Sequence, residues 1–376
     1  MSKKNDDRQN VIIIGGGYAG YNAAKTLGKT LDTTRYNVLL ITSRPYFVNL
    51  VAGIRMLVTA EGKLEDTAFV PYDRLAGVTH QIATVSSIEE TAPGKGGNVV
   101  LKDGERVPYV ALVLATGSLW NGPLASYGSD DDGEIRAALE RWRTRYAEAN
   151  HIVVVGGGAV GIETAGEIRD AYPSKKITLI HGDSQLVNST YPERFRKRIE
   201  SCVRERGIEL ILGDYIDNIP ESGTVGVVTR KGVKLADADL VVTAFGSRPN
   251  TSLVESLGDG VLTETRHVRV KSTLELPEHP GVFATGDIIN WREQKQAGKA
   301  SKHGVVVAAN VASFLAGQPQ TKAYKGSTEM IAIPVGKYYG AGYFDFLWGI
   351  SIGNWLTSII KGRTLLTPMF RGQLGY

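Results

Sequence analysis

Three glycines near the start of the chain, Gly15, Gly17 and Gly20, follow four β-branched residues and form a G-x-G-x-x-G pattern. Between a buried strand and a helix, this pattern binds a pyrophosphate. The first glycine permits the tight turn, the second lets the backbone approach the phosphates, and the third lets helix and strand pack closely. Free N–H groups and the dipole at the helix N-terminus favour the anion. The pattern predicts a dinucleotide site, with Tyr18 and Ala19 in the same loop.

The same pattern occurs again at Gly156, Gly158 and Gly161, after another run of β-branched residues. A single copy is a weak signal, because a glycine-rich turn without a ligand can have the same spacing. Two copies are far more specific, and they indicate either two nucleotide sites or a duplicated domain with one inactive copy. We expect both copies to bind a nucleotide, with Ala159 and Val160 in the second loop.

Both glycine patterns need parallel strands and helices to position them. Runs of β-branched and other apolar residues are typical of strands that are buried on both faces. The predicted strands are 11–14, 37–41, 110–114, 152–155 and 177–180, and helices are expected at 18–28, 134–148 and 298–315.

The residue that ends the second strand of such a fold is usually an acid, which binds the ribose hydroxyls. In the first copy this position is Thr42, whose hydroxyl can still bond the ribose, while Arg44 can lie over the adenosine or a phosphate. In the second copy it is His181, which does not repel a 2′-phosphate, and Lys175 or Arg194 can supply positive charge. The sequence therefore permits NADPH and does not exclude NADH. Alternatively, His181 only lines the adenine pocket.

Composition and charge argue against several other classes of protein. The formal net charge is +4, and the one short basic cluster, 194–198, is flanked by glutamates, so nucleic acid is not expected as the primary partner. A single cysteine, Cys202, excludes an intramolecular disulfide framework and a C-x-x-C redox pair. The other histidines show no metal-ligand spacing, so no metal site is expected. No apolar stretch is long enough for a transmembrane helix, and Ser2 stands where N-myristoylation needs glycine.

Three further motifs occur in order along the chain: Ala-Thr-Gly at 115–117, between the fingerprints, then Gly-Ser-Arg-Pro-Asn at 246–250 and Ala-Thr-Gly-Asp at 284–287. Across residues 10–317 the sequence resembles the two-dinucleotide-binding-domain flavoprotein family. The absence of paired cysteines argues against its glutathione-reductase and thioredoxin-reductase branches. With the segment 49–55, the match looks closest to the fungal AIF-like (AMID) proteins and to the ferroptosis-suppressor-type NAD(P)H:quinone oxidoreductases.

This resemblance implies an α/β fold with two Rossmann-like domains and a short C-terminal α+β segment. The FAD domain is expected to be discontinuous, with the NAD(P)H domain inserted into it. The expected divisions are a disordered tail at 1–9, an FAD-binding domain at 10–123 and 255–325, an NAD(P)H-binding domain at 124–254, and a C-terminal segment at 326–376 that covers the flavin and acceptor site.

The resemblance also implies which residues hold FAD. Asp287, next to Gly286, is expected to reach the ribitol and phosphate region, with a plain helix cap as the alternative. Arg55 is expected to bind the pyrophosphate, with a surface salt bridge as the alternative. The remaining cofactor-binding candidates besides those named above are Val85, Ala115, Thr116, Gly117 and Gly246.

Three residues are candidates for the chemistry itself. Glu163 lies at the start of the second fingerprint helix, where the resemblance implies a contact with the nicotinamide amide or ribose; a carboxylate that only complements the helix dipole is the alternative. Lys302 and His303 lie where the family's chain passes near the flavin ring, and a cation there can stabilise the reduced flavin. A solvated helix end is the alternative for both. Glu167, one turn after Glu163, is expected to be structural.

Apolar residues between 344 and 359 recur at spacings of three and four and predict an amphipathic helix. Phe344, Leu347 and Trp348 are candidates for a quinone-binding mouth or for an interfacial contact with a membrane. Alternatively, the stripe packs on the FAD domain or on a second copy of the chain, which leaves a homodimer open.

The resemblance implies an FAD-dependent oxidoreductase that transfers hydride from NADH or NADPH to FAD and passes electrons to a quinone or to oxygen. Two alternatives stay open: an AIF-like redox-sensing or death-signalling flavoprotein with slow turnover, and a reductase of a small iron protein. We expect the protein in the cytoplasm, or peripherally on a lipid droplet, mitochondrial or other membrane surface, and not secreted.

Overall fold

The first of two parallel sheets takes its strands from both ends of the chain. The computed structural model describes residues 7–220, 224–346 and 349–376. Six strands pair in the order β18-β19-β9-β1-β2-β5, and all neighbours are parallel except β18 and β19. These strands are β1 (Gln9–Ile14), β2 (Tyr36–Thr42), β5 (Val78–Ile82), β9 (Ala111–Leu114), β18 (Glu275–Leu276) and β19 (His279–Ala284).

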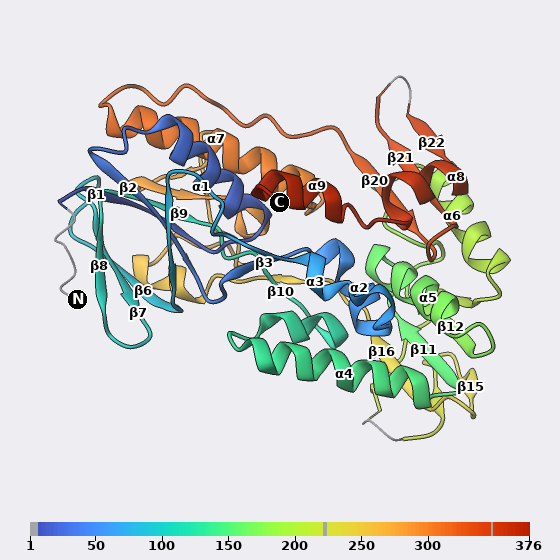
Figure 1. The fold of residues 1–376 in the computed structure, drawn as a ribbon. Helices are drawn as coiled ribbons and strands as arrows, with labels where there is room; N and C mark the ends of the chain where they lie inside the picture. The colour runs from blue at the N-terminus through green and yellow to red at the C-terminus, as the bar shows by residue number, and fades with distance from the viewer. Residues whose placement is uncertain (1–6, 221–223, 347–348) are drawn as a thin grey trace.

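Two helices, α1 (Tyr18–Thr30) and α7 (Ala297–Leu315), lie side by side on one face of this sheet (Figure 1). They approach closely because Gly304 has no side chain: a Cβ there would lie 2.5 Å from the carbonyl oxygen of Ala19. On the opposite side lies an antiparallel sheet of β6 (Val85–Glu90), β7 (Gly97–Leu101) and β8 (Arg106–Tyr109). The core between these layers is built on the buried strands β1, β2 and β9.

The second sheet has four parallel strands in the order β13-β12-β11-β16. Helix α5 starts inside the second glycine fingerprint, directly after Gly158, and α6 follows β12. A separate hydrophobic core joins this sheet to both helices. The elements are β11 (His151–Val155), α5 (Ala159–Ala171), β12 (Lys176–His181), α6 (Glu193–Glu205), β13 (Glu209–Leu212), β14 (Val227–Val228), β15 (Lys234–Leu235) and β16 (Leu240–Thr243).

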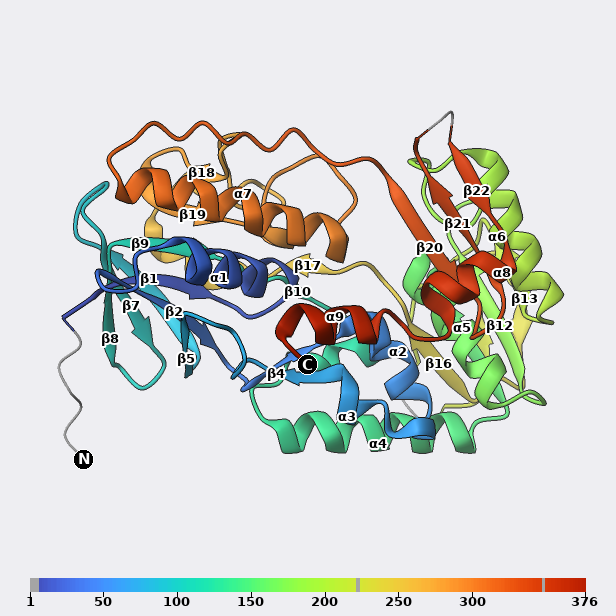
Figure 2. The ribbon, with the colours of Figure 1, turned by 45° about the horizontal axis from the view of Figure 1, so that its top comes forward.

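Two of the crossings between the domains pair with each other, as β10 (Ser118–Leu119) and β17 (Arg248–Pro249). Helix α4 (Asp132–Glu148) runs along both domains at one side of this junction (Figures 1 and 2). The side chain of Asp131 caps α4 by accepting from the N–H of Glu134 at 3.0 Å. The shorter elements near the crossings are β3 (Tyr46–Val48), α2 (Leu50–Val58), η1 (Glu61–Lys63), α3 (Glu65–Ala68), β4 (Phe69–Pro71), η2 (Gly122–Gly128), η3 (Ser252–Leu257) and η4 (Gly286–Ile288).

The C-terminal segment contacts both domains (Figure 2). Strands β20 (Met330–Pro334), β21 (Gly340–Phe344) and β22 (Ile350–Ile352) form an antiparallel sheet whose buried side chains join the core of the second domain. The chain then turns through α8 (Asn354–Thr357) and the π-helix η5 (Ser358–Gly362), and α9 (Thr367–Leu374) packs beside α1. The rings of Tyr18 and Phe370 lie 4.9 Å apart in this contact.

The predicted amphipathic helix over residues 344–359 is wrong. Phe344 ends β21, and the chain turns back to form β22 before a single helical turn begins at Asn354. Gly349 has a φ of +77°, a left-handed conformation that suits a turn and not a continuous helix. The hairpin is more stable here than a helix would be, because its strands pair with each other and pack on α6. An amphipathic pattern without such packing does not stabilise a helix enough. Leu347 and Trp348 lie outside the described residues.

The predicted α/β class, with two Rossmann-like domains and a short C-terminal α+β segment, is confirmed. The first sheet includes β1 and β19, which come from opposite sides of the second domain in the sequence. Within the described ranges, no helix has the length and apolar character needed to cross a bilayer.

Candidate functional site

The first fingerprint forms a cradle whose shape depends on its glycines. Gly15 has a φ of +99°, and a Cβ there would lie 2.5 Å from the carbonyl oxygen of Ala115. A Cβ on Gly20 would lie 1.8 Å from the carbonyl oxygen of Gly15. No described atom lies within 4 Å of a Cβ built on Gly17, which caps α1 without a side-chain hydrogen bond. The geometry therefore leaves space in front of a helix N-terminus, as a bound pyrophosphate requires.

The second fingerprint repeats this geometry, with the same Cβ-to-carbonyl distances at its first and third glycines. Gly156 has a φ of +122°, and its Cβ would lie 2.5 Å from the carbonyl oxygen of Ala244. A Cβ on Gly161 would lie 1.8 Å from the carbonyl oxygen of Gly156, while the space around Gly158 is open within the described structure. Both copies thus keep the close approaches and the open position that a dinucleotide needs.

The Gly-Asp turn lies beside the first cradle. Gly286 has a φ of +77°, and a Cβ there would lie 3.0 Å from the side chain of Ala19 in the fingerprint loop. The Asp287 carboxylate accepts from the Ser118 hydroxyl at 2.7 Å. Lys295, which the sequence did not single out, interacts electrostatically with Asp287, and burial lowers the pKa of its ammonium group. No local sequence signal distinguishes Lys295. Its proximity to Asp287 depends on how the chain after Asp287 folds back toward that carboxylate.

The structure corrects the expectation that His303 presents a cation to the flavin. His303 is 1% exposed, and its Nδ1 accepts a hydrogen bond from the N–H of Gly286 at 3.2 Å. The ring proton therefore belongs on Nε2, which lies 2.8 Å from Oε1 of Glu293. His303 supports the Gly-Asp turn from behind, buried between Gly286 and Glu293. Lys302, its neighbour on α7, is exposed, so the two side chains do not form one cationic site.

The expected contact of Arg55 with the pyrophosphate is also wrong. The Arg55 guanidinium forms two hydrogen bonds with the Glu167 carboxylate, at 2.7 and 2.8 Å. It also donates to the carbonyl oxygens of Gly362, at 2.6 Å, and Arg363, at 3.2 Å. The pair is buried, and it joins α2 of the first domain to α5 of the second and to the C-terminal segment. The alternative of a surface salt bridge is wrong too, and Glu167 has the structural role that was expected of it.

Glu163, the candidate for nicotinamide contact, has a cationic partner from the C-terminal segment. Lys361 Nζ donates to the Glu163 carboxylate at 2.6 Å and to the carbonyl oxygen of Ala332 at 3.2 Å. Burial raises the pKa of Glu163, and the nearby Lys361 and Arg55 oppose that shift. The pairing of Lys361 with Glu163 depends on the tertiary fold, because the two residues lie 198 positions apart in the chain.

The two strand ends hold their polar residues differently. Thr42 Oγ1 donates to the carbonyl oxygen of Arg44 at 3.1 Å, and the Arg44 side chain donates to the carbonyls of Tyr127 and Ser129. His181 Nδ1 accepts from the N–H of Gly157 at 3.1 Å, and burial lowers the pKa of this imidazole. His181 is therefore neutral at neutral pH and lies directly beneath the second fingerprint loop.

The remaining candidates are spread over the junction. Ala115 is buried against the first fingerprint, and Thr116 donates its hydroxyl to the carbonyl of Asn250 at the crossing between domains. Positions Gly117 and Gly246 have no described atom within 4 Å of an added Cβ. Val85 begins β6 and pairs with Leu101.

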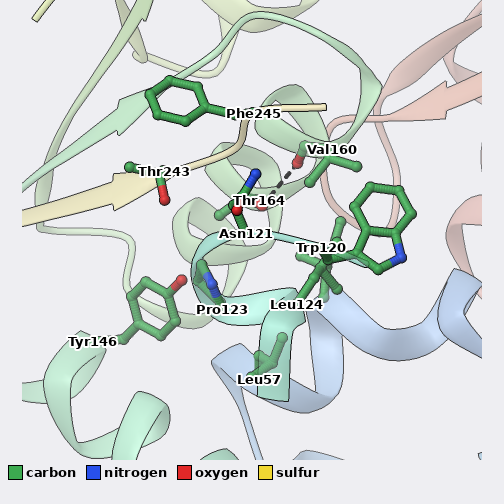
Figure 3. A pocket seen from close by; sticks show the side chains of 11 residues that line it. Leu57, Trp120, Asn121, Pro123, Leu124, Tyr146, Val160, Thr164, Thr243 and Phe245 are labelled. Atoms are coloured by element: carbon green, nitrogen blue, oxygen red, sulfur yellow. Dashed lines mark hydrogen bonds between the residues drawn. The ribbon is translucent and has the colours of Figure 1, made fainter. Parts of the chain in front are cut away.

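An apolar pocket lies between the two domains (Figure 3). One wall comes from α2 and η2 of the first domain, and the other from α5, β16 and the second residue after β16. Val160, in the second fingerprint loop, lines it together with Trp120 and Phe245. None of the lining residues is charged. Phe344, in β21, is not a lining residue and packs beside Phe346 with ring centroids 5.9 Å apart.

Two intact phosphate cradles therefore fit FAD and a nicotinamide dinucleotide. The sequence pattern of the pyridine nucleotide-disulphide oxidoreductases matches residues 9–304. The chain belongs to this family. It is an FAD-dependent oxidoreductase with NADH or NADPH as electron donor, and it acts on a small electron acceptor. The family name includes disulphide chemistry, but the single cysteine of this chain cannot form an internal disulfide.

Comparison with known proteins confirms the predicted resemblance. FAD-dependent oxidoreductase FVFD30 from Flammulina velutipes is 43% identical over 85% of this chain and 99% of its own length. Ferroptosis suppressor protein 1 from Homo sapiens is 28% identical over 94% of this chain and 93% of that protein. Apoptosis-inducing factor homolog B from Dictyostelium discoideum is 28% identical over 98% and 97%, respectively. The sulfide:quinone oxidoreductase structure from Aquifex aeolicus aligns with a TM-score of 0.76 at 18% identity, covering 97% and 91% of the two chains, which shows the fold alone.

Proposed function

We propose that the protein oxidises NAD(P)H and passes the electrons to a quinone. The observation that carries this proposal is the uncharged, partly aromatic lining of the pocket between the domains, whose cavity of about 10 Å³ must widen to admit a quinone ring. A flat, uncharged acceptor suits such a lining better than an ionic substrate does. The chain has one cysteine, so electrons have no disulfide to pass through and must reach the acceptor from the flavin directly.

Bound FAD would supply the hydride acceptor and release electrons to the quinone. The chain's own residues bind and orient the two dinucleotides. The open positions at Gly17 and Gly158 admit the pyrophosphates, and the N-termini of α1 and α5 favour their charge. Asp287, held by Ser118, is the residue that we expect to bind the ribitol chain. We propose that Glu163 binds the nicotinamide ribose or amide. Lys361 holds the Glu163 carboxylate in place for this contact.

An anaerobic titration of the purified protein tests this function. We expect NADH or NADPH to bleach the flavin absorbance, and a soluble quinone to restore it rapidly. Bleaching without recovery by quinone would contradict the proposal, and would favour a redox-sensing flavoprotein or a protein acceptor. A protein without flavin after purification and FAD reconstitution would contradict the assignment of the first cradle.

The Glu163–Lys361 pair predicts a change in pH dependence. In Lys361→Met the burial that raises the pKa of Glu163 is no longer opposed by the ammonium group, so this pKa rises further. If the carboxylate form positions the nicotinamide, the rate of flavin reduction will fall at a higher pH than in the wild type. Stopped-flow bleaching between pH 5 and 9 measures this shift. Glu163→Gln should remove the acid limb.

The control for this experiment is Lys337→Met, which removes a C-terminal lysine that pairs with Glu61 at the surface. Its pH profile should match the wild type. An unchanged profile in Lys361→Met would contradict the role assigned to Glu163.

We also propose peripheral membrane contact through the C-terminal segment, where a quinone acceptor would be found. Exposed apolar side chains gather there, and Arg194 and Arg198 of α6 lie against Gly349 and Gly353 of the same hairpin region. Apolar groups beside cations suit an anionic bilayer surface. The exposed apolar residues are Phe346, Ile350, Trp355, Leu356, Ile359 and Ile360.

Trp355→Ser tests this contact, because Trp355 is 69% exposed and has the largest side chain of the group. We expect its binding to vesicles of zwitterionic and anionic phospholipid to weaken about tenfold, the loss for one buried large apolar side chain. Val228→Ser removes an exposed apolar side chain from β14 and should bind as the wild type does. Equal binding of all three proteins would contradict the proposal.

A further inference from the structure

The second nucleotide site has an acid, two residues beyond the usual position. Ribose-binding acids end the second strand of the fold, where this chain has His181. Asp183 follows in the loop after β12, with its side chain 67% exposed and its Oδ2 3.8 Å from His181 Nε2. The carboxylate therefore lies at the edge of the sheet that bears the second phosphate cradle.

The orientation of His181 determines where this region offers a hydrogen-bond donor. Because Nδ1 accepts from the N–H of Gly157, the ring proton is on Nε2, on the side of Asp183. Nε2 is buried and has no hydrogen-bond partner in the part of the chain that the structure describes. Burial also lowers the pKa of the imidazole, so His181 contributes no positive charge at neutral pH. Besides the Gln185 backbone, which also acts on this imidazole, a ribose oxygen is the acceptor that we assign to this N–H.

The cations that the sequence offered for a 2′-phosphate are occupied elsewhere. Lys175 donates to the carbonyls of Ala147 and Ala149, next to the start of β11 and therefore at the opposite edge of the sheet. Arg194 donates to the carbonyl of Gly349 in the C-terminal hairpin.

Two other cations lie in the neighbourhood of His181. Arg196 acts on the charge of His181, but its guanidinium donates to the backbone carbonyls of residues 185–187. Lys231 lies beside the Asp214 carboxylate, which accepts from its backbone N–H. The Asp183 carboxylate lies 3.8 Å from His181 Nε2, on the same side of the ring as its proton.

We propose that Asp183 makes the protein specific for NADH, by accepting hydrogen bonds from the adenosine ribose hydroxyls and by repelling a 2′-phosphate. His181 Nε2 donates to the same ribose. This inference rests on the NAD(P)H half of the proposed function and is independent of the quinone half.

The test compares the affinity of the oxidised FAD-loaded protein for ADP-ribose and for 2′-phospho-ADP-ribose by titration calorimetry. We expect the wild type to favour ADP-ribose by tenfold or more. In Asp183→Asn that preference should shrink by about tenfold or more, because a charged hydrogen-bond acceptor is lost and the repulsion disappears. Asp183→Glu, which keeps the charge, should still reject the 2′-phosphorylated ligand.

Asp237→Asn is the matched control. Asp237 is also well exposed, at 61%, but pairs with His151 and Lys176 at the opposite edge of the same sheet. Its variant should keep the wild-type ratio of affinities. A ratio in Asp183→Asn equal to that of Asp237→Asn would overturn the proposal, as would a wild type that prefers the 2′-phosphorylated ligand. Since no quinone is present, failure of the quinone assay leaves this result unaffected, and failure of this assay leaves quinone reduction intact.

Discussion

Gly158→Val is expected to abolish reduction of the flavin by NAD(P)H while the protein keeps its fold and its FAD. No described atom lies within 4 Å of a Cβ at this position, so the new side chain fits the protein and occupies the space for the pyrophosphate. The φ of Gly158 is −78°, which valine adopts without strain. We expect anaerobic bleaching to slow by ~100-fold or more, because a displaced nicotinamide loses its alignment with the flavin.

Two related variants separate this effect from loss of folding. Gly17→Val is the equivalent change in the first cradle and should yield a folded protein that loses FAD instead. Gly156→Val should misfold or lose stability, because Gly156 has a φ of +122° and its Cβ would lie 2.5 Å from the Ala244 carbonyl. Rapid bleaching of Gly158→Val, at the wild-type rate, would contradict a nucleotide site in the second domain.

Arg55→Met is expected to cause the largest loss of stability, about 3–5 kcal/mol in the free energy of unfolding. It leaves the Glu167 carboxylate buried without its partner, and removal of one member of a buried pair costs about this much. It also leaves the carbonyl of Gly362 without its donor. Urea unfolding of the FAD-loaded protein, followed by tryptophan and flavin fluorescence, measures the loss.

The loss in the free energy of unfolding that Arg55→Met causes should depend on pH, and the pKa of Glu167 gives the direction. Burial raises the pKa of Glu167, and Arg55 opposes that shift in the wild type. Without Arg55 the folded-state pKa lies further above the unfolded value, so the folded protein binds a proton that the unfolded chain releases. The variant is then relatively most stable below the unfolded pKa, and stability falls as pH rises toward the folded-state value. We therefore expect the deficit to grow between about pH 4 and neutrality.

The double variant Arg55→Met, Glu167→Met controls for the pair. Replacing both charges with apolar side chains should recover most of the stability, because the desolvation penalty disappears with them. If Arg55→Met alone lost less than about 1 kcal/mol, the value of an exposed pair, the structural role given to this contact would be contradicted.

The fold and both cradles could be predicted because their determinants are local. Gly15 and Gly156 adopt positive φ values, and Gly20 and Gly161 tolerate contacts that any Cβ would prevent, so spacing alone reports the geometry. The long strands are likewise marked by their own buried β-branched residues. The C-terminal hairpin escaped prediction because a three-and-four spacing does not reveal that strands β21 and β22 pair with each other and pack on α6.

The sequence by itself determined that this protein has two dinucleotide cradles, an FAD domain interrupted by a second Rossmann-like domain, and no cysteine pair for disulfide chemistry. Only the tertiary structure decided the partners of its charged and titratable residues. Arg55 pairs with Glu167, Glu163 with Lys361, and His303 with the Gly286 amide. The first two of these pairs join residues more than a hundred positions apart in the chain. A charge chooses its partner by burial and proximity, which are properties of the assembled domains and not of neighbouring residues.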